Sequence, residues 1–189
     1  MTEVLTRGVT ARVASWLGAL ALLLAAGTAA PADDREDLVA ESWAAVAAFQ
    51  KAEPKLRAFF DKAHAYAVFP SVTKIAYVYG LAGGEGVVFE GGGVTGFSTL
   101  KQVTMGFQAG VHHFREVIFF RDADALEDFK QGHFEFDAEA SAAAGKAGVS
   151  EVLDFDKDVL VFVMTRGGLF FDASLGGQKF SFTDKEHGE

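Results

Sequence analysis

The chain has 189 residues, half of them hydrophobic, and a formal net charge of -9 at pH 7. This length suits one domain, and the apolar content excludes a disordered chain, which could not bury enough surface to fold. The acidic balance argues against a general nucleic-acid-binding protein, because such proteins need cations to neutralise phosphates. The absence of cysteine excludes disulfides, thiolate zinc sites and cysteine nucleophiles.

The first 32 residues have the pattern of a cleavable secretory signal peptide. Residues 13–26 are apolar or small at nearly every position, and Ala30 and Ala32 fit the cleavage pattern that places the cut before Asp33. A membrane anchor is the alternative, but the apolar run is shorter than the about 20 residues that a spanning helix needs. We therefore expect a periplasmic or secreted protein after cleavage. Without cysteine, the chain cannot be a lipoprotein.

Two helices are expected at the start of the remaining chain, over residues 33–51 and 54–63. Apolar residues recur at helical spacing in the first of them. Pro54 interrupts that pattern and suits the first turn of the second helix. We expect the apolar faces of both helices to cover a sheet formed by the rest of the chain.

After these helices the hydrophobic period changes to two, which is typical of strands. A short strand over residues 65–69 is expected to end at Pro70, and a second strand is expected over residues 72–79. Glycine-rich turns are predicted at residues 83–86 and 91–93.

The clearest alternation of apolar and polar residues runs over 103–111, and a further strand is expected over 114–120. A short helix is predicted from Asp122 or Asp124 to Gly132, because Asp124 with Glu127 resembles a capping box. Residues 138–148, rich in alanine and glycine, are expected to form a tightly packed turn region. The last strands are expected around residues 159–165, 169–174 and 178–183.

Helices followed by short strands with glycine turns predict an α+β fold. Ten glycines between Gly80 and Gly110 favour close backbone approach and strong curvature. We therefore expect N-terminal helices packed on a strongly curved, largely antiparallel, barrel-like β-sheet. No linker is evident, so residues 33–189 are expected to form a single domain.

The residues that usually carry catalysis do not form a recognisable site in this sequence. Residues 80–93 are rich in glycine but lack the lysine of a phosphate-binding loop. His112 and His113 would point to opposite faces of a strand. Residues 154–158 begin like a calcium loop but lack its later glycine and glutamate. We predict no catalytic residue, no metal site and no cofactor.

One local reversal of charge lies between residues 51 and 74, where five cations oppose only Glu53 and Asp61. Phe59 and Phe60 lie in the same segment. Basic residues beside exposed aromatic residues suit a helix that meets anionic lipid headgroups. The alternative, which the residues alone favour, is that both phenylalanines pack into the core and the cations are merely solvated. The candidate lipid-binding residues are Lys51, Lys55, Arg57, Phe59, Phe60, Lys62 and Lys74.

Six short motifs follow one another between residues 56 and 182. They are AVFPSVTK at 67–74, GEGVV at 84–88, GFQAG at 106–110, IFF at 118–120 with Ala125, Leu126 and Phe129, DAEAS at 137–141, and Gly168-Leu169 with Ser174-Leu175. In this order they resemble the SYLF domains, which occur in eukaryotic endocytic and actin-patch adaptors and in many exported bacterial proteins. The first motif is similar to the family's apolar-Phe-Pro-x-x-x-Lys segment.

The resemblance implies a lipid-binding module without enzyme activity. In eukaryotic members it implies phosphoinositide binding through an N-terminal amphipathic helix and nearby basic residues. Actin binding is implied for some fungal members, but an exported bacterial protein would not meet actin. Because the basic segment adjoins the Phe-Pro-x-x-x-Lys motif, the resemblance adds weight to its assignment as a lipid-binding site.

We therefore predict a non-enzymatic domain of an exported bacterial protein that binds phosphoinositide-type or other anionic lipid on a membrane surface. The alternative is a periplasmic structural or protein-interaction module without lipid affinity. Such a module would use exposed strands or the helix that carries Trp43, and the sequence does not identify its protein partner.

Overall fold

The computed structural model describes residues 32–76, 79–105, 110–133, 158–165, 168–171 and 178–185. The predicted signal peptide, apart from Ala32, and the predicted turn region at residues 138–148 lie outside the described residues.

Among the residues that the structure describes, four helical elements flank the strands. They are α2 (Ala32–Ala52), the 3-10 helix η1 (Pro54–Leu56), α3 (Arg57–Lys62) and α4 (Ala123–Lys130). The strands are β1 (Ala65–Ala76), β2 (Tyr79–Glu90), β3 (Gly93–Met105), β4 (Gly110–Phe120), β5 (Val159–Thr165), β6 (Gly168–Phe171) and β7 (Gln178–Asp184). The helices expected at the start of the chain and after residue 120, and the three C-terminal strands, are confirmed.

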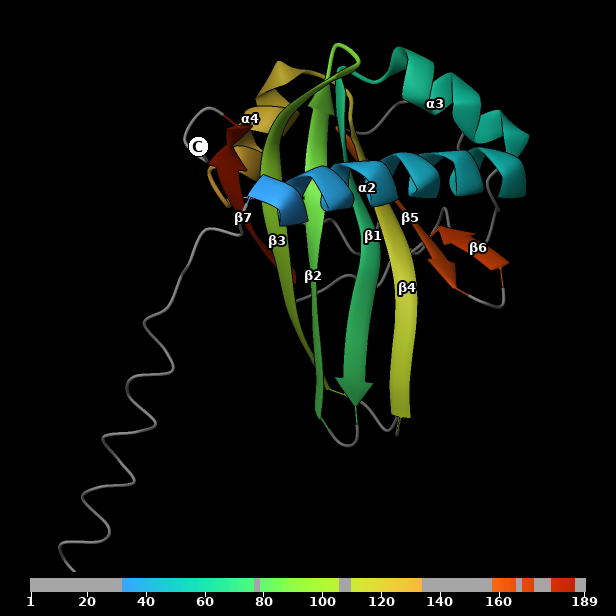
Figure 1. Ribbon diagram of the computed structural model, residues 1–189, viewed down its shortest axis with the longest axis vertical. Coiled ribbons are helices and arrows are strands. Elements are labelled where there is room, and N and C mark those ends of the chain that lie inside the picture. The colour runs from blue at the N-terminus through green and yellow to red at the C-terminus, as the bar shows by residue number, and fades with distance from the viewer. Residues whose placement is uncertain are drawn as a thin grey trace, which may run out of the picture. The chain divides into compact units, whose positions relative to one another are not determined.

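All the strands form one antiparallel sheet in the order β6-β5-β4-β1-β2-β3-β7, so β1 is the central strand (Figure 1). An α+β fold with helices on an antiparallel sheet is therefore confirmed. Within the described residues the order ends at β6 on one side and β7 on the other. The closed, strongly curved, barrel-like form that the glycine content predicts is not confirmed.

The expectation that Pro70 ends a strand is wrong, because β1 runs through it from Ala65 to Ala76. Proline cannot donate a ladder hydrogen bond and is tolerated inside a sheet only at a bulge. The ladders to both neighbours shift here, between Val68 and Ser71 toward β2 and between Phe69 and Val72 toward β4. The bulge absorbs the proline and joins the two strands that the sequence predicts separately.

The turn predicted at residues 83–86 is also wrong, since these residues lie within β2. Two of their glycines, Gly84 and Gly86, allow close contact with β1. A Cβ on Gly86 would lie 2.6 Å from Cδ1 of Phe69 and 2.7 Å from the carbonyl oxygen of Val68. The turn at residues 91–93 is confirmed, because Gly91 and Gly92 have φ of 58° and 82°, which side chains rarely adopt.

The alternation over residues 103–111 is shared between two strands, because β3 ends at Met105 and β4 begins at Gly110. Residues 106–109, between them, lie outside the described residues. The two strands are not neighbours in the sheet, so period-two alternation by itself does not show where one strand stops and the next begins.

At one end of the sheet both faces are buried. On one face α2 and α3 cover a core cluster that includes Val46, Phe59 and Phe89. On the opposite face α4 and β7 help to cover a second cluster, which includes Phe69 and Phe129. The first residues of β1 are therefore buried without alternation, as expected for a strand that is covered on both sides.

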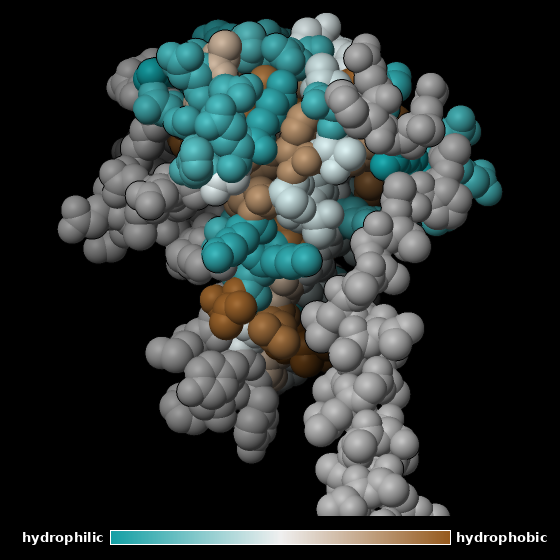
Figure 2. Space-filling view, turned by 90° about the vertical axis from the view of Figure 1, so that its left-hand side faces the viewer, coloured by the Kyte–Doolittle hydropathy of each residue, from teal (hydrophilic) through white to brown (hydrophobic). Residues whose placement is uncertain are grey.

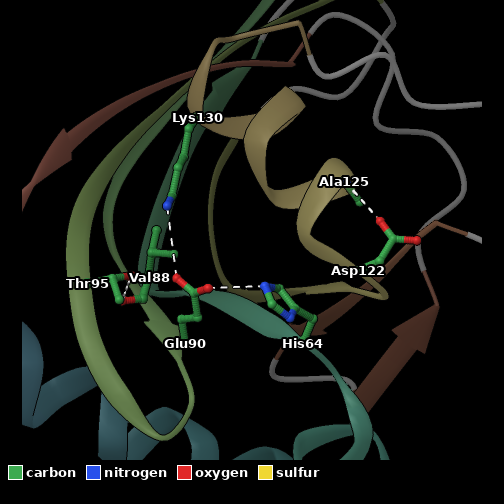
Figure 3. A network of polar contacts seen from close by, with 7 residues as sticks. All are labelled: His64, Val88, Glu90, Thr95, Asp122, Ala125 and Lys130. Carbon is green, nitrogen blue, oxygen red and sulfur yellow. Dashed lines mark hydrogen bonds and ion pairs between the residues drawn. The ribbon is translucent and has the colours of Figure 1, made fainter.

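Polar contacts join the elements at this end (Figure 3). The carboxylate of Glu90, at the end of β2, lies 3.1 Å from Nε2 of His64 and 4.0 Å from Nζ of Lys130. Of the two residues predicted to begin this helix, Asp122 is the N-cap of α4, and its carboxylate accepts a hydrogen bond of 3.0 Å from the backbone N–H of Ala125. Glu90 thus links the start of β1 to the end of α4.

Replacing Gly86 by alanine tests the close approach of β1 and β2. We expect Gly86→Ala to lower the free energy of unfolding by about 1–3 kcal/mol, because the new methyl group overlaps Phe69 and the β1 backbone. The control is Gly93→Ala, whose Cβ has no neighbour nearer than 3.8 Å, and we expect a change within about 0.5 kcal/mol. Denaturant unfolding measures both, and equal effects would contradict this account of Gly86.

The cap of α4 predicts a pH dependence. The backbone N–H of Ala125, which donates to the carboxylate, lowers the pKa of Asp122 below its usual value. A lowered folded-state pKa contributes stability that is present above the unfolded-state pKa of about 3.9 and is lost as the pH falls through the folded-state value. We expect Asp122→Ala to unfold at lower denaturant than the parent chain at pH 7, and this difference to shrink below about pH 4. Asp122→Asn, which keeps a capping oxygen without the charge, is the control.

Candidate functional site

Four of the predicted cations lie on the chain between the end of α2 and the end of α3. Lys51 is in the last turn of α2, Lys55 is in η1, and Arg57 and Lys62 begin and end α3. All four side chains are exposed. We refer to Lys51, Lys55, Arg57 and Lys62 as the cationic segment.

Local interactions hold this segment in a fixed conformation. Pro54 occupies the first turn of η1, and the side chain of Glu53 caps it by accepting a hydrogen bond of 3.1 Å from the backbone N–H of Lys55. Leu56 is completely buried beneath it. This short helix therefore packs Leu56 on the core and presents Lys55 to the solvent, while the carboxylate of Glu53 is engaged in the cap.

The two phenylalanines of the predicted site face the core. Phe59 is 2% exposed, and its ring centroid lies 5.8 Å from those of both Phe119 and Phe162. Phe60 is half-buried and contacts Tyr66 and Phe119 edge-on, with centroids 5.1 and 4.8 Å apart. The structure therefore agrees with the alternative considered from the sequence, in which Phe59 and Phe60 pack into the core. Any contact of the cationic segment with lipid would be made by its cations.

Lys74 does not join the cationic segment. It lies nine residues along β1 from Ala65, which corresponds to about 30 Å for an extended strand. It is half-buried and paired in register with Ala82 and His112. The sequence predicts one site from five cations, and the structure divides these between the two ends of the sheet.

The charges of the described N-terminal region are segregated along α2. Its first part carries Asp33, Asp34, Glu36, Asp37 and Glu41. The distance from Asp34 to Lys51 is about 25 Å along the helix axis, which is well beyond the screening length at physiological salt. The acidic end of α2 therefore does not neutralise the cationic segment.

Large exposed hydrophobic residues point to a second feature that the sequence did not reveal. Trp43 is 44% exposed, but its ring packs on Phe89 with centroids 4.8 Å apart. The others lie together on neighbouring strands at the end of the sheet away from the helices, and they are Ile75, Leu81, Val103 and Val111. The alternation over residues 103–111 marks two of them, but only the strand register shows that they meet.

Within the described parts of the chain, no three histidine or acidic residues are grouped to hold a metal ion. Nor does any helix there combine the length and apolar character needed to cross a membrane.

Comparison with known proteins identifies a family that this chain resembles. The model of the Ysc84 family, described as a Las17-binding protein actin regulator, matches residues 101–188. The predicted resemblance to the SYLF family is confirmed. SYLF domains are non-catalytic binding domains associated with lipid and with actin-patch proteins. The matched range begins at Lys101, so the cationic segment lies outside it.

A curated relative has a similar sequence over much of the chain. Beta cell expansion factor A from Aeromonas veronii is 28% identical over 137 residues, which cover 71% of this chain and 51% of the relative. The chain thus spans about half the length of this SYLF-family relative.

The assignment of Phe59 to the core predicts a large effect on stability. We expect Phe59→Ala to lower the free energy of unfolding by about 3–5 kcal/mol, because it removes a buried ring from contact with Phe119 and Phe162. Arg57→Ala, on the exposed side of the same helix, is expected to change it by no more than about 0.5 kcal/mol. Thermal or denaturant unfolding distinguishes them, and a Phe59→Ala effect as small as the Arg57→Ala effect would place the ring at the surface.

Proposed function

We propose that this SYLF protein is a non-enzymatic, exported domain that binds the surface of anionic membranes. The observation that carries the proposal is the cationic segment, whose four exposed side chains lie at the end of α2, in η1 and in α3, above the buried Leu56 and Phe59. The match to the Ysc84 family model supports a binding role, because this family is associated with lipid binding and with actin regulation.

Electrostatics supports an oriented encounter with such a membrane. The chain as a whole carries -9, so nonspecific attraction to an anionic bilayer is weak. Along the axis of α2, Lys51 lies about 15–25 Å from the acidic residues of the first part of that helix, so those carboxylates stay beyond the screening length while the segment approaches headgroups. Each cation held near an anionic surface contributes about 1 kcal/mol to binding.

Co-sedimentation with vesicles tests the proposal. We expect the chain to sediment with vesicles of phosphatidylcholine mixed with phosphatidylglycerol or a phosphoinositide, less with phosphatidylcholine alone, and less at high salt. The double variant Lys55→Glu with Lys62→Glu is expected to weaken binding at low salt at least tenfold, since two favourable contacts become repulsive.

The matched control reverses one exposed lysine elsewhere and is compared with Lys62→Glu alone. Lys185→Glu, just after β7, changes the net charge equally and should retain most of the binding. If these two single variants bind alike, the cationic segment is not the contact. If the parent chain ignores every vesicle at low salt, the lipid function fails, and the protein-interaction alternative takes its place.

A further inference from the structure

The exposed apolar residues at the far end of the sheet form one continuous row across four strands. In register order the row consists of Val111 of β4, Ile75 of β1, Leu81 of β2 and Val103 of β3. These residues, here called the distal row, are 60%, 61%, 63% and 59% exposed, respectively. Neighbouring side chains in such a row lie about 5 Å apart, so the four make a contiguous apolar edge.

The distal row lies on the same sheet face that α2 and α3 cover at the other end. Along β2, Phe89 and Val87 are buried beneath the helices, and the alternation continues through Glu85 to Leu81 on that face. The strands β1 to β4 extend beyond α2 (Figure 1). Figure 2 shows strongly hydrophobic surface at this end of the sheet, next to a band of hydrophilic residues.

Polar residues separate the distal row from the helix-covered core. The adjacent row contains Lys101, Thr73 and His113, and Oγ1 of Thr73 lies 3.1 Å from Nδ1 of His113. One row further on, exposed Arg115 follows on β4. Beside it, an open hollow of about 260 Å³ is bordered by residues that include the Pro70 bulge, His113 and Arg115.

The charges around the distal row have one sign. The described far ends of the strands, residues 72–76, 79–84, 100–105 and 110–114, contain Lys74 and Lys101 but no aspartate or glutamate. Arg115 follows in the next row, which also holds Glu85. The first carboxylate on this face is Glu85, paired with Ser71. In a chain of net charge -9, this local excess of cations favours an anionic partner.

The spacing matches the boundary between headgroups and acyl chains. For extended strands, the rows of His113 and Arg115 lie about 7 and 13 Å from the distal row. Interfacial apolar surfaces sink about 5–10 Å into this boundary. When the distal row enters the acyl layer, the row of Lys101 and His113 therefore lies at the level of the lipid phosphates, and the row of Arg115 and Glu85 lies about 7 Å further out.

A second copy of the chain is a poorer fit. Four partly exposed aliphatic side chains offer no more than a few hundred Å², whereas a stable interface takes about 800 Å² from each partner. Two copies would also bring like charges together. An anionic bilayer needs no minimum contact area of this size, and its charge is opposite to that of the cations around the distal row.

We propose that the far end of β1–β4 is a second lipid-contact site, at which the distal row inserts into the acyl layer of an anionic bilayer and Lys101, His113 and Arg115 meet its headgroups. The choice of a bilayer as the ligand rests on the proposed function. The site itself is separate from the cationic segment, since about 30 Å of β1 lies between them.

A fluorescent probe tests insertion directly, because the chain has no cysteine of its own. Leu81→Cys and, as a control on the same face of β2, Glu85→Cys are each labelled with nitrobenzoxadiazole. With vesicles of equal phosphatidylcholine and phosphatidylglycerol, we expect a blue shift and quenching by acyl-chain doxyl groups for Leu81→Cys. The Glu85→Cys label, about 13 Å away along the strand, should show much less of either.

Substitution of the distal row supplies the second measurement. Ile75→Thr with Leu81→Thr keeps side chains compatible with strands but removes apolar surface, and we expect vesicle affinity to fall at least tenfold. The conservative pair Ile75→Leu with Leu81→Ile should keep it. Equal unfolding midpoints for the two pairs show that folding is not the cause.

The outcomes separate this site from the proposed function. If the chain sediments with vesicles while the Leu81→Cys label stays in water, the distal site is refuted and the lipid function stands. If the label becomes buried without vesicles as protein concentration rises, a second copy covers the row and the proposal is also refuted. If nothing binds vesicles, both fail. The distal site is supported if the Leu81→Cys label enters the acyl layer and if Ile75→Thr with Leu81→Thr lowers the affinity for vesicles.

Discussion

The structure depends on how its central strand accommodates a proline. Pro70 cannot donate a ladder hydrogen bond, so both ladders shift around it. Before the bulge, Tyr66 and Val68 face the helices α2 and α3, whereas beyond it Thr73 and Ile75 occupy that face. A strand without the extra residue would place Lys74 in the distal row instead of Ile75. The bulge therefore sets which side chains meet the solvent at the far end.

Much of the fold follows from patterns that are local in sequence. The amphipathic spacing in α2, the proline at the start of η1 and the short C-terminal strands are predicted correctly, because each depends on neighbouring residues. The errors involve contacts between distant residues. Pro70 is predicted to end a strand because its bulge depends on the pairing of β1 with β2 and β4. Gly86 is predicted to lie in a turn because the Phe69 ring that requires a glycine there lies on another strand.

The candidate sites show the same division. The cationic segment is continuous in sequence, and its charge excess is apparent without a structure. The sequence does not show that Phe59 faces the core, because a helix of six residues has too few apolar positions to define its buried side. The distal row takes one residue from each of four strands, so no window of sequence contains it. Only the register of the four strands brings these residues together.

The part of the sheet beyond the bulge is largely independent of the core on its helix side. The four side chains of the distal row are each about three-fifths exposed and belong to neither core cluster. Substitutions at these four positions therefore cost the folded state little stability. The helix-covered half of the sheet maintains the scaffold, so the apolar character of its far end can be altered without loss of the fold.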